Sequence, residues 1–279
     1  MNNIESLYKE IKPVNKEIAS LAQKHFDQLI KPVGSLGKLE KMVSKYLGII
    51  EEINPSLVSY PSKSLLVFSN KDNADYLLLA KENLLPISIL ANSINAQLFI
   101  IENSKTKLNV ENEINASLNL GYKKAFAKKI SKQLVGLGSN SSFKVDKELL
   151  NLNDPIKLLL HFSDSELSEM VGCIFALVKN KNQIIVDGLK SCVALWIASL
   201  FNPVVLEYAF ASHISTEEYH QDLLIKLVLT PILKLDITQG DCEGTAFVFT
   251  VFDAGLKAYK EMDTFNDANV HEELESFTK

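Results

Sequence analysis

The chain has 279 residues, of which 47% are hydrophobic and 23% are charged, and its formal net charge is −5. These values are typical of a globular protein with one large domain or two modest ones. The acidic balance and the lack of a basic stripe argue against nucleic acid as a partner. The longest apolar run, residues 192–201, is too short to cross a membrane, and the N-terminus lacks a signal-peptide pattern. We therefore expect a cytoplasmic protein with no membrane partner.

The chain contains no arginine, so all 29 basic residues are lysines. No guanidinium group is available to bind a phosphate or a carboxylate in bidentate fashion. An anionic ligand has to be held by lysines, hydroxyls, backbone N–H groups and helix N-termini. The three cysteines, Cys173, Cys192 and Cys242, are widely spaced and match no zinc-binding pattern.

Residues 1–60 predict a segment that contains helices only. The stretch 31–37 interrupts them as a stiff loop, because Pro32 fixes its own backbone and Gly34 permits a turn that other residues resist. Ser35 is the expected N-cap of the helix that follows, whose apolar residues recur at helical spacing. On local physics alone, this stretch is a well-made turn before a core helix.

Short apolar runs alternate with helices in the rest of the chain, residues 61–279. Such runs are typical of parallel strands that are covered on both faces. The pattern predicts an α/β core, a layered parallel sheet flanked by helices, with the N-terminal helical segment packed alongside and a mostly helical C-terminal part. The expected strands are 64–69, 96–102, 133–137, 183–187 and 204–206. The expected helices of this part include 74–92, 114–130 and 246–259.

Ligands of such folds collect beyond the carboxyl ends of the strands. The segment that follows the third expected strand is rich in glycine, then in hydroxyl and amide groups. Glycines let backbone N–H groups approach an oxyanion, and the hydroxyls add donors. An ordinary strand-to-helix loop is the alternative. The candidate phosphate-binding residues are Gly136, Gly138, Asn140, Ser141 and Ser142.

A second candidate segment follows the fourth expected strand. Asp187 and Gly188 end this strand, and the carboxylate either orients a ligand or caps the next helix. Lys190 and Ser191 then fall on the first helical turn, a position suited to an anion. Further on, His213 lies in a polar turn, but no partner carboxylate lies at a spacing that indicates a catalytic triad.

Two carboxylates, Asp241 and Glu243, lie between glycines just before a strongly apolar helix. An acidic residue at a helix N-terminus is normally a stabilised anion, which is the structural interpretation. The functional interpretation is a general base on a glycine-flanked loop.

Taken in order, these segments resemble the nicotinate-nucleotide–dimethylbenzimidazole phosphoribosyltransferases. The family's K-P-x-G-S-L-G-[RK]-L-E is met residue for residue by Lys31–Glu40, and its V-L-D-G-F-x-S-x-A-A-L is mirrored by 185–195. Three further family segments, E-I-A-A-M-A-G, A-S-H-x-S-x-E and the closing E-M-x-T-F-x-x-A-x-V, are approximated or met by 166–172, 211–217 and 261–270. The resemblance covers nearly the whole chain.

The resemblance implies transfer of the phosphoribosyl group of nicotinate mononucleotide to a nitrogen of a benzimidazole, with a glutamate as general base. The implied partners are a nucleotide and a heterocyclic base, and the implied assembly is a homodimer with an α/β core. No metal and no organic cofactor is implied. Lys31, Pro32, Gly34 and Ser35 become candidate substrate-binding residues.

The departures from the family are equally informative. The phosphate loop G-E-M-G-I-G-N-T-T survives only as residues 136–142, and the base-pocket elements that follow the first strand are missing. Counting without gaps from His213 places Asp241 at the catalytic glutamate, where a side chain one methylene shorter retreats by roughly 1.5 Å. Glu243 restores the reach if the register slips by two.

Two hypotheses follow. One is an active phosphoribosyltransferase. The other is a non-catalytic relative, either a partner subunit in a heterodimer with a full-length relative or a ligand-binding protein on the same scaffold.

Overall fold

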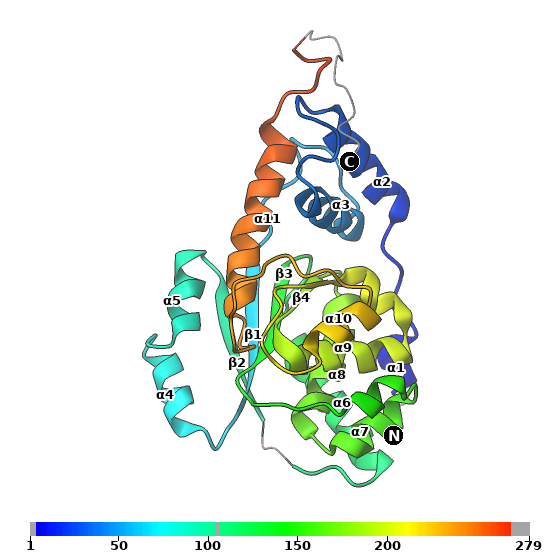
Figure 1. The fold of residues 1–279 in the computed structure, drawn as a ribbon, viewed down its shortest axis with the longest axis vertical. Coiled ribbons are helices and arrows are strands. Elements are labelled where there is room, and N and C mark those ends of the chain that lie inside the picture. Colours follow the sequence, from blue (N-terminus) through cyan, green and yellow to red (C-terminus); the bar gives the residue numbers. More distant parts are fainter. Residues whose placement is uncertain (1–3, 104–105, 269–279) are drawn as a thin grey trace. The chain divides into compact units, whose positions relative to one another are not determined.

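The computed structural model describes residues 4–103 and 106–268, and its core is one five-stranded sheet of order β2-β1-β3-β4-β5 (Figure 1). All four strand pairs are parallel, which confirms the expected α/β layered fold. The inner strands are apolar and buried, as strands covered on both faces must be. The strands are β1 (Lys63–Asn70), β2 (Gln97–Asn103), β3 (Leu134–Ser139), β4 (Gln183–Val186) and β5 (Ala209–Ala211).

The chain divides into two compact units. The first contains the chain up to Pro13 and Ser62–Val248, and the second contains Val14–Pro61 and the chain from Phe249 onward. This division differs from the expected one into 1–60 and 61–279, because the second unit draws on both ends of the chain. The whole sheet lies in the first unit.

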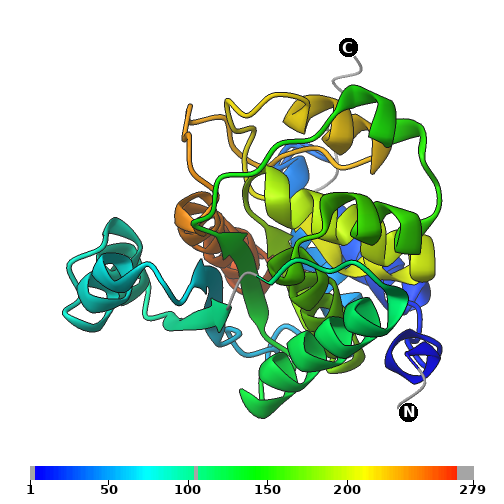
Figure 2. The same ribbon diagram turned by 90° about the horizontal axis from the view of Figure 1, so that it is seen from below.

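The helices of the first unit cover the sheet and its edge. α9 packs on β3 and β4, α8 packs on β4 and on α9, and α6 packs on α8. In both views α4 and α5 lie beyond the β2 edge of the sheet (Figures 1 and 2). These elements are α1 (Glu5–Tyr8), α4 (Ala74–Lys81), α5 (Pro86–Ser93), α6 (Glu111–Ala127), η1 (Lys147–Asn151), α7 (Pro155–Phe162), α8 (Ser165–Lys179), α9 (Gly188–Phe201), η2 (Pro203–Tyr208) and α10 (His220–Lys226).

Two expected elements of this unit are wrong. Residues 204–206 form part of the 3-10 helix η2 instead of a strand, because the Asn202 side chain accepts a hydrogen bond from the Val204 N–H at 3.0 Å and Pro203 fixes a turn-compatible φ. The single helix 74–92 is two helices, α4 and α5. The chain leaves the first at Asn83, which has a φ of 55°, and Pro86 begins the second.

The crossing of α6 over α8 depends on two glycines. A Cβ built at Gly172 would lie 2.0 Å from the Leu118 carbonyl oxygen, and one at Gly121 would lie 1.9 Å from the Glu169 carbonyl oxygen. Both obstacles are helix backbone, which cannot turn aside as a flexible side chain does. The two helices therefore touch backbone to backbone.

We expect Gly172→Ala to lower the free energy of unfolding by about 1–3 kcal/mol, the usual effect of overpacking a core. Urea unfolding followed by circular dichroism measures it. Gly255→Ala is the matched control, because a Cβ there meets the Val43 side chain at 3.2 Å and no backbone atom closer than that. Equal stability of the two variants would contradict the backbone contact.

The second unit contains α2 (Lys16–Gln28), α3 (Lys38–Ile50) and the C-terminal part of α11 (Glu243–Glu261), which begins in the first unit. Asn15 caps α2 by accepting from the Ile18 N–H at 3.1 Å. Tyr46 of α3 meets Phe252 of α11 edge to face, with ring centroids 5.3 Å apart. The apolar face of α3 is thus covered by a helix from the other end of the sequence.

The expected cap of α3 is wrong. Gly37, with a φ of 56°, occupies the N-cap position, and no side chain caps the helix there. Ser35 lies in the turn before it, where its N–H donates to the Pro32 carbonyl at 3.0 Å. Of the closing family segment 261–270, residues 269 and 270 lie outside the described residues.

Candidate active site

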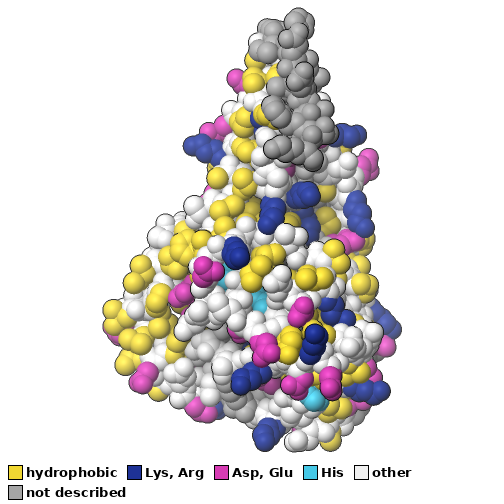
Figure 3. All heavy atoms as spheres, in the orientation of Figure 1, with side chains coloured by type: hydrophobic (Ala, Val, Ile, Leu, Met, Phe, Trp, Pro, Cys, Tyr) yellow, Lys and Arg dark blue, Asp and Glu magenta, His cyan; other side chains and the backbone are white. Residues whose placement is uncertain are grey.

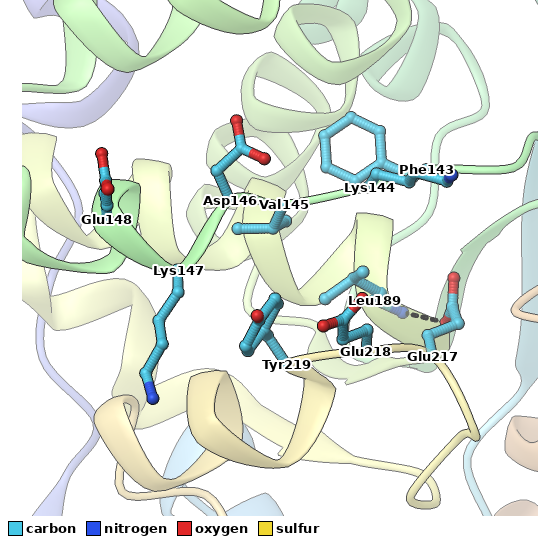
Figure 4. A pocket seen from close by; sticks show the side chains of 10 residues that line it. All are labelled: Phe143, Lys144, Val145, Asp146, Lys147, Glu148, Leu189, Glu217, Glu218 and Tyr219. Carbon is cyan, nitrogen blue, oxygen red and sulfur yellow. Dashed lines mark hydrogen bonds between the residues drawn. The ribbon is translucent and has the colours of Figure 1, made fainter.

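A pocket of about 310 Å³ lies at the carboxyl ends of β3 and β4 in the first unit. It adjoins a wider hollow of about 650 Å³, since the two share Phe143, Leu189 and Glu217 (Figure 4). This is the place where open parallel sheets bind ligands. The smaller pocket is lined by residues 139–143, Asp187, Leu189, Lys190, Glu217 and residues 238–240.

Gly136 and Gly138 do not form the expected anion-binding loop. Both lie inside β3, paired with β1. A Cβ at Gly136 would lie 2.6 Å from Cγ2 of Thr245, and one at Gly138 would lie 2.3 Å from the Gly240 carbonyl oxygen. Two glycines two residues apart share one face of a strand. They are small because the acidic loop, residues 240–242, and Thr245 in the first turn of α11 pack directly on that face.

The hydroxyls at the carboxyl end of β3 converge on the Glu166 carboxylate, which the sequence analysis did not select as a site residue. Ser139 and Ser141 both donate to Glu166, the latter at 3.1 Å. Lys190 Nζ lies 2.8 Å from Glu166 Oε1 and 2.8 Å from Asp164 Oδ2. Glu166 is 0% exposed, so its charge requires this lysine. A carboxylate in the first turn of the largely apolar helix α8 was the available signal.

The remaining residues of this segment contribute to the pocket. The Asn140 amide donates to the Ser69 hydroxyl at 3.1 Å, which ties the end of β3 to β1, and Ser142 lies on the lining. The structure therefore brings together Asn140, Ser141, Ser142 and Lys190, as expected from the strand ends.

Asp187 occupies the N-cap position of α9, but its side chain makes no cap bond, so the capping interpretation is wrong. Its Oδ1 accepts from the Ser212 hydroxyl and contacts Nδ1 of His213 at 3.2 Å. The Leu189 N–H donates instead to Glu217 Oε2 at 2.7 Å (Figure 4). A carboxylate from another loop thus takes the place at the helix N-terminus.

His213 has the partner carboxylate that sequence spacing did not reveal. Burial would lower the pKa of His213, but the hydrogen bond and the charge of Asp187 outweigh burial and raise it above its usual value. His213 Nε2 is buried and has no hydrogen-bond partner among the described residues. Gly244 lies against this pair, since a Cβ there would be 2.3 Å from Nδ1 of His213.

Gly188 and Ser191 serve the fold of this region. Gly188 has a φ of +76° and lies against Gly240, where a Cβ would be 2.6 Å from the Gly240 Cα. Ser191 is fully buried and donates its hydroxyl to the Asp187 carbonyl at 2.7 Å. Its expected place on an anion site is wrong, because the hydroxyl bonds back to its own helix.

Asp241 and Glu243 follow the pocket lining in the chain, which ends at Gly240, but neither residue is part of that lining. Gly240 lines the pocket, its carbonyl accepts from the Ser139 N–H at 2.7 Å, and Cys242 N lies 2.9 Å from a Cβ built at Gly138. The acidic loop and the glycines of β3 are therefore direct neighbours.

Asp241 is a strongly perturbed acid. It is 3% exposed, its Oδ2 lies 3.4 Å from the Tyr76 hydroxyl, and its Oδ1 has no hydrogen-bond partner among the described residues. Burial, followed by the charges of Glu243 and Asp187, raises the pKa of Asp241 to about 7. Glu243 begins α11 and is half-buried, and burial followed by Asp187 raises its pKa as well.

The remaining candidates, Lys31, Pro32, Gly34 and Ser35, belong to the second unit. Lys31 is buried and its Nζ lies 2.8 Å from Glu40 Oε1, while Gln23 donates to Glu40 Oε2 at 2.7 Å. The first and last residues of the ten-residue motif are thus joined by an ion pair that closes the loop.

A sequence model of a phosphoribosyltransferase family, DBI_PRT, matches residues 11–72 and 138–270. The chain belongs to this phosphoribosyltransferase family. The two matched stretches contain the closed loop of the second unit and every residue that lines the smaller pocket. The resemblance found in the sequence is confirmed, and family membership makes the protein a transferase by class.

Individual members of the family resemble the chain over its length. The nicotinate-nucleotide–dimethylbenzimidazole phosphoribosyltransferase of Chlorobium chlorochromatii is 24% identical over 352 aligned positions, which cover 98% of this chain and 99% of that protein. The namesake from Geotalea uraniireducens is 35% identical over 119 residues, 43% of this chain and 34% of that protein. The crystal structure of CobT from Thermus thermophilus superimposes with a TM-score of 0.78 at 17% identity, over 92% of this chain and 99% of that one.

The phosphoribosyltransferase family model leaves out residues 73–137 of this chain, which hold α4, α5, β2, α6 and the start of β3. The alignment to the Chlorobium protein spans 352 positions against 279 residues here, so that relative has sequence that this chain lacks. In the part of the chain that the structure describes, no helix is long and apolar enough to cross a membrane. The described residues also hold no cluster of His, Cys, Asp or Glu suited to a metal ion.

Proposed function

We propose that the protein transfers the phosphoribosyl group of nicotinate mononucleotide to a nitrogen of a benzimidazole-like base and releases nicotinate. Family membership and the activity for which its relatives are named support this reaction. The observation that carries the proposal is a buried acid of raised pKa beside a hydroxyl-lined pocket at the carboxyl ends of the strands.

Asp241 is our candidate for the general base. A base works best when its pKa lies near the working pH, and that of Asp241 is raised to about 7. Its Oδ1, which has no hydrogen-bond partner among the described residues, is the atom left to take the proton from the attacking nitrogen. Glu243 supplies a neighbouring negative charge that helps to raise this pKa.

The phosphate of the nucleotide has to be held without arginine. Ser141, Ser142 and the amide of Asn140 line the pocket, and Lys190 is the cation on that lining. We propose that the phosphate binds against these groups. We assign Asp187, which follows the neighbouring parallel strand β4 and lines the same pocket, to orienting the ribose hydroxyls.

One observation favours the non-catalytic alternative. The groups expected to bind the phosphate already have carboxylate partners within the protein, since Glu166 accepts from Ser141 and pairs with Lys190, and Glu217 accepts at the start of α9. A phosphate has to compete with these carboxylates. A non-catalytic partner subunit would need no such exchange.

Incubation of the pure protein with nicotinate mononucleotide and 5,6-dimethylbenzimidazole separates the two functions. We expect nicotinate and α-ribazole phosphate to appear in equal amounts, measured by liquid chromatography, with no nicotinate released when the base is omitted. Absence of both products, with the protein alone and mixed with a full-length relative, would contradict the proposed reaction. Products only in the mixture would identify a partner subunit.

We also propose that the protein forms a homodimer, as the family resemblance implies. Hydrophobic side chains gather over α4 and α5 on the face shown in Figure 3, and Leu78, Leu84 and Ile89 are each more than half exposed. Contiguous apolar surface of this kind marks sites of association. A cytoplasmic location remains an expectation from the sequence.

A further inference from the structure

Tyr76 joins an element outside the matched family segments to the acidic loop. It lies on α4, within residues 73–137, which the family model does not match. Its hydroxyl nevertheless lies 3.4 Å from Oδ2 of Asp241, 165 positions further along the chain. A helix outside the segments that the family model matches thus contacts the candidate base.

Tyr76 lies on a helix that is poorly buried. None of the α4 side chains described is fully buried, and Leu78 and Leu79 are exposed. Tyr76 is half-buried, and burial is the first cause of the raised pKa of its phenol, followed by the charges of Asp241 and Cys242. The phenol therefore stays protonated at neutral pH and acts as a donor.

We infer that Tyr76 is a positioning residue of the transferase, whose hydroxyl binds Oδ2 of Asp241 and leaves Oδ1 as the atom that accepts the substrate proton. This inference rests on the proposed function. The distance of 3.4 Å is longer than a typical O–H···O bond, as catalytic hydrogen bonds often are before substrate binds.

The charges around Asp241 determine the direction of the effect. Glu243 and Asp187 face it as carboxylates and raise its pKa, and the buried Cys242 thiol lies next to it in the chain. The hydrogen bond from Tyr76 acts in the opposite direction and lowers the pKa of Asp241. Loss of the Tyr76 hydroxyl therefore raises this pKa, whereas loss of the Glu243 charge lowers it.

The experiment compares Tyr76→Phe with the wild-type protein over pH 5–9. Phenylalanine keeps the aromatic ring and removes only the hydroxyl. The base has to be ionised to accept a proton. We therefore expect the acid limb of the kcat/KM profile to move to higher pH by about one unit in Tyr76→Phe. At pH values below that limb, kcat/KM should be up to about tenfold lower than in the wild type. KM for nicotinate mononucleotide should change little.

Two further variants sharpen the test. Tyr122→Phe removes the hydroxyl of another half-buried tyrosine of the same unit, away from the pocket, and should leave the limb in place. Glu243→Gln should move the limb to lower pH. A Tyr76→Phe limb that coincides with those of the wild type and Tyr122→Phe would overturn the inference.

A direct titration separates this inference from the proposed function. Carbon-13 NMR of carboxyl-labelled aspartate, with the Asp241 signal assigned by its loss in Asp241→Asn, reports the pKa of Asp241 without any turnover. We expect a higher pKa in Tyr76→Phe. If the wild-type protein transfers no phosphoribosyl group, the proposed function fails, and an unchanged Asp241 pKa in Tyr76→Phe independently refutes the contact.

Discussion

Asp241→Asn is expected to lower kcat for nicotinate release by about 10²–10⁴-fold, the usual contribution of a positioned general base. Asparagine keeps the size of the side chain and removes its ability to take a proton. Initial rates at saturating nicotinate mononucleotide and base measure the effect. Glu243→Gln is the matched control two residues away, and we expect it to retain most of the activity at pH 8. If Glu243→Gln loses more activity than Asp241→Asn, the base is Glu243.

Asp241→Asn should also change the free energy of unfolding, in a direction that follows from the raised pKa of Asp241. The pKa of Asp241 is raised to about 7 from an ordinary value of 3.8, so the folded state binds this proton more tightly than the unfolded state between those pH values. Ionising the buried carboxyl above pH 7 therefore opposes folding. We expect Asp241→Asn to be more stable than wild type at pH 8, with the difference shrinking as the pH falls towards 4. Lower stability at pH 8 would contradict the raised pKa.

Lys31→Met is expected to lower the free energy of unfolding by about 3–5 kcal/mol, since it leaves the Glu40 carboxylate buried without its partner. Urea unfolding of the full chain at pH 7 measures the loss. The double variant Lys31→Met with Glu40→Leu should recover part of it, because no unpaired charge remains. A stability equal to that of wild type would contradict a structural role for the closed loop.

The pair also predicts how stability changes in acid. Burial would raise the pKa of Glu40, but hydrogen bonds from Lys31, Gln23 and the Leu36 N–H outweigh burial and hold it below its ordinary value of 4.5. The stabilisation is therefore fully present above pH 4.5 and is lost as the pH falls through the lower value in the folded state. In Lys31→Met this acid-side loss should be much smaller.

Local pattern predicts most of the sheet. The expected strands 64–69 and 183–187 hold short continuous apolar runs between turn signals, which are typical of strands covered on both faces. The run at 204–206 is just as apolar, but Pro203 and the Asn202 cap give it a helical turn. The sequence therefore contains a strand signal and a helix signal at this place, and their relative strength depends on the packing around β5.

The sequence predicts where the site lies, but it predicts only part of the site's chemistry. Parallel strands end at one edge, so segments after β3 and β4 had to meet there. The packing partners of the β3 glycines, the acidic loop and Thr245 of α11, lie about a hundred positions away, so the sequence alone did not reveal why these residues are small. Glu166 was missed for the same reason. Its hydroxyl and lysine partners come from β3 and α9, and only the fold brings them together.

A structure of the protein with nicotinate mononucleotide and benzimidazole bound would test the central claim most directly. We predict the nucleophilic nitrogen of the base within about 3 Å of the Asp241 carboxylate, the reach of a general base, and the phosphate against Ser141 and Ser142. A nucleotide bound elsewhere, or a base nitrogen out of reach of both Asp241 and Glu243, would contradict it.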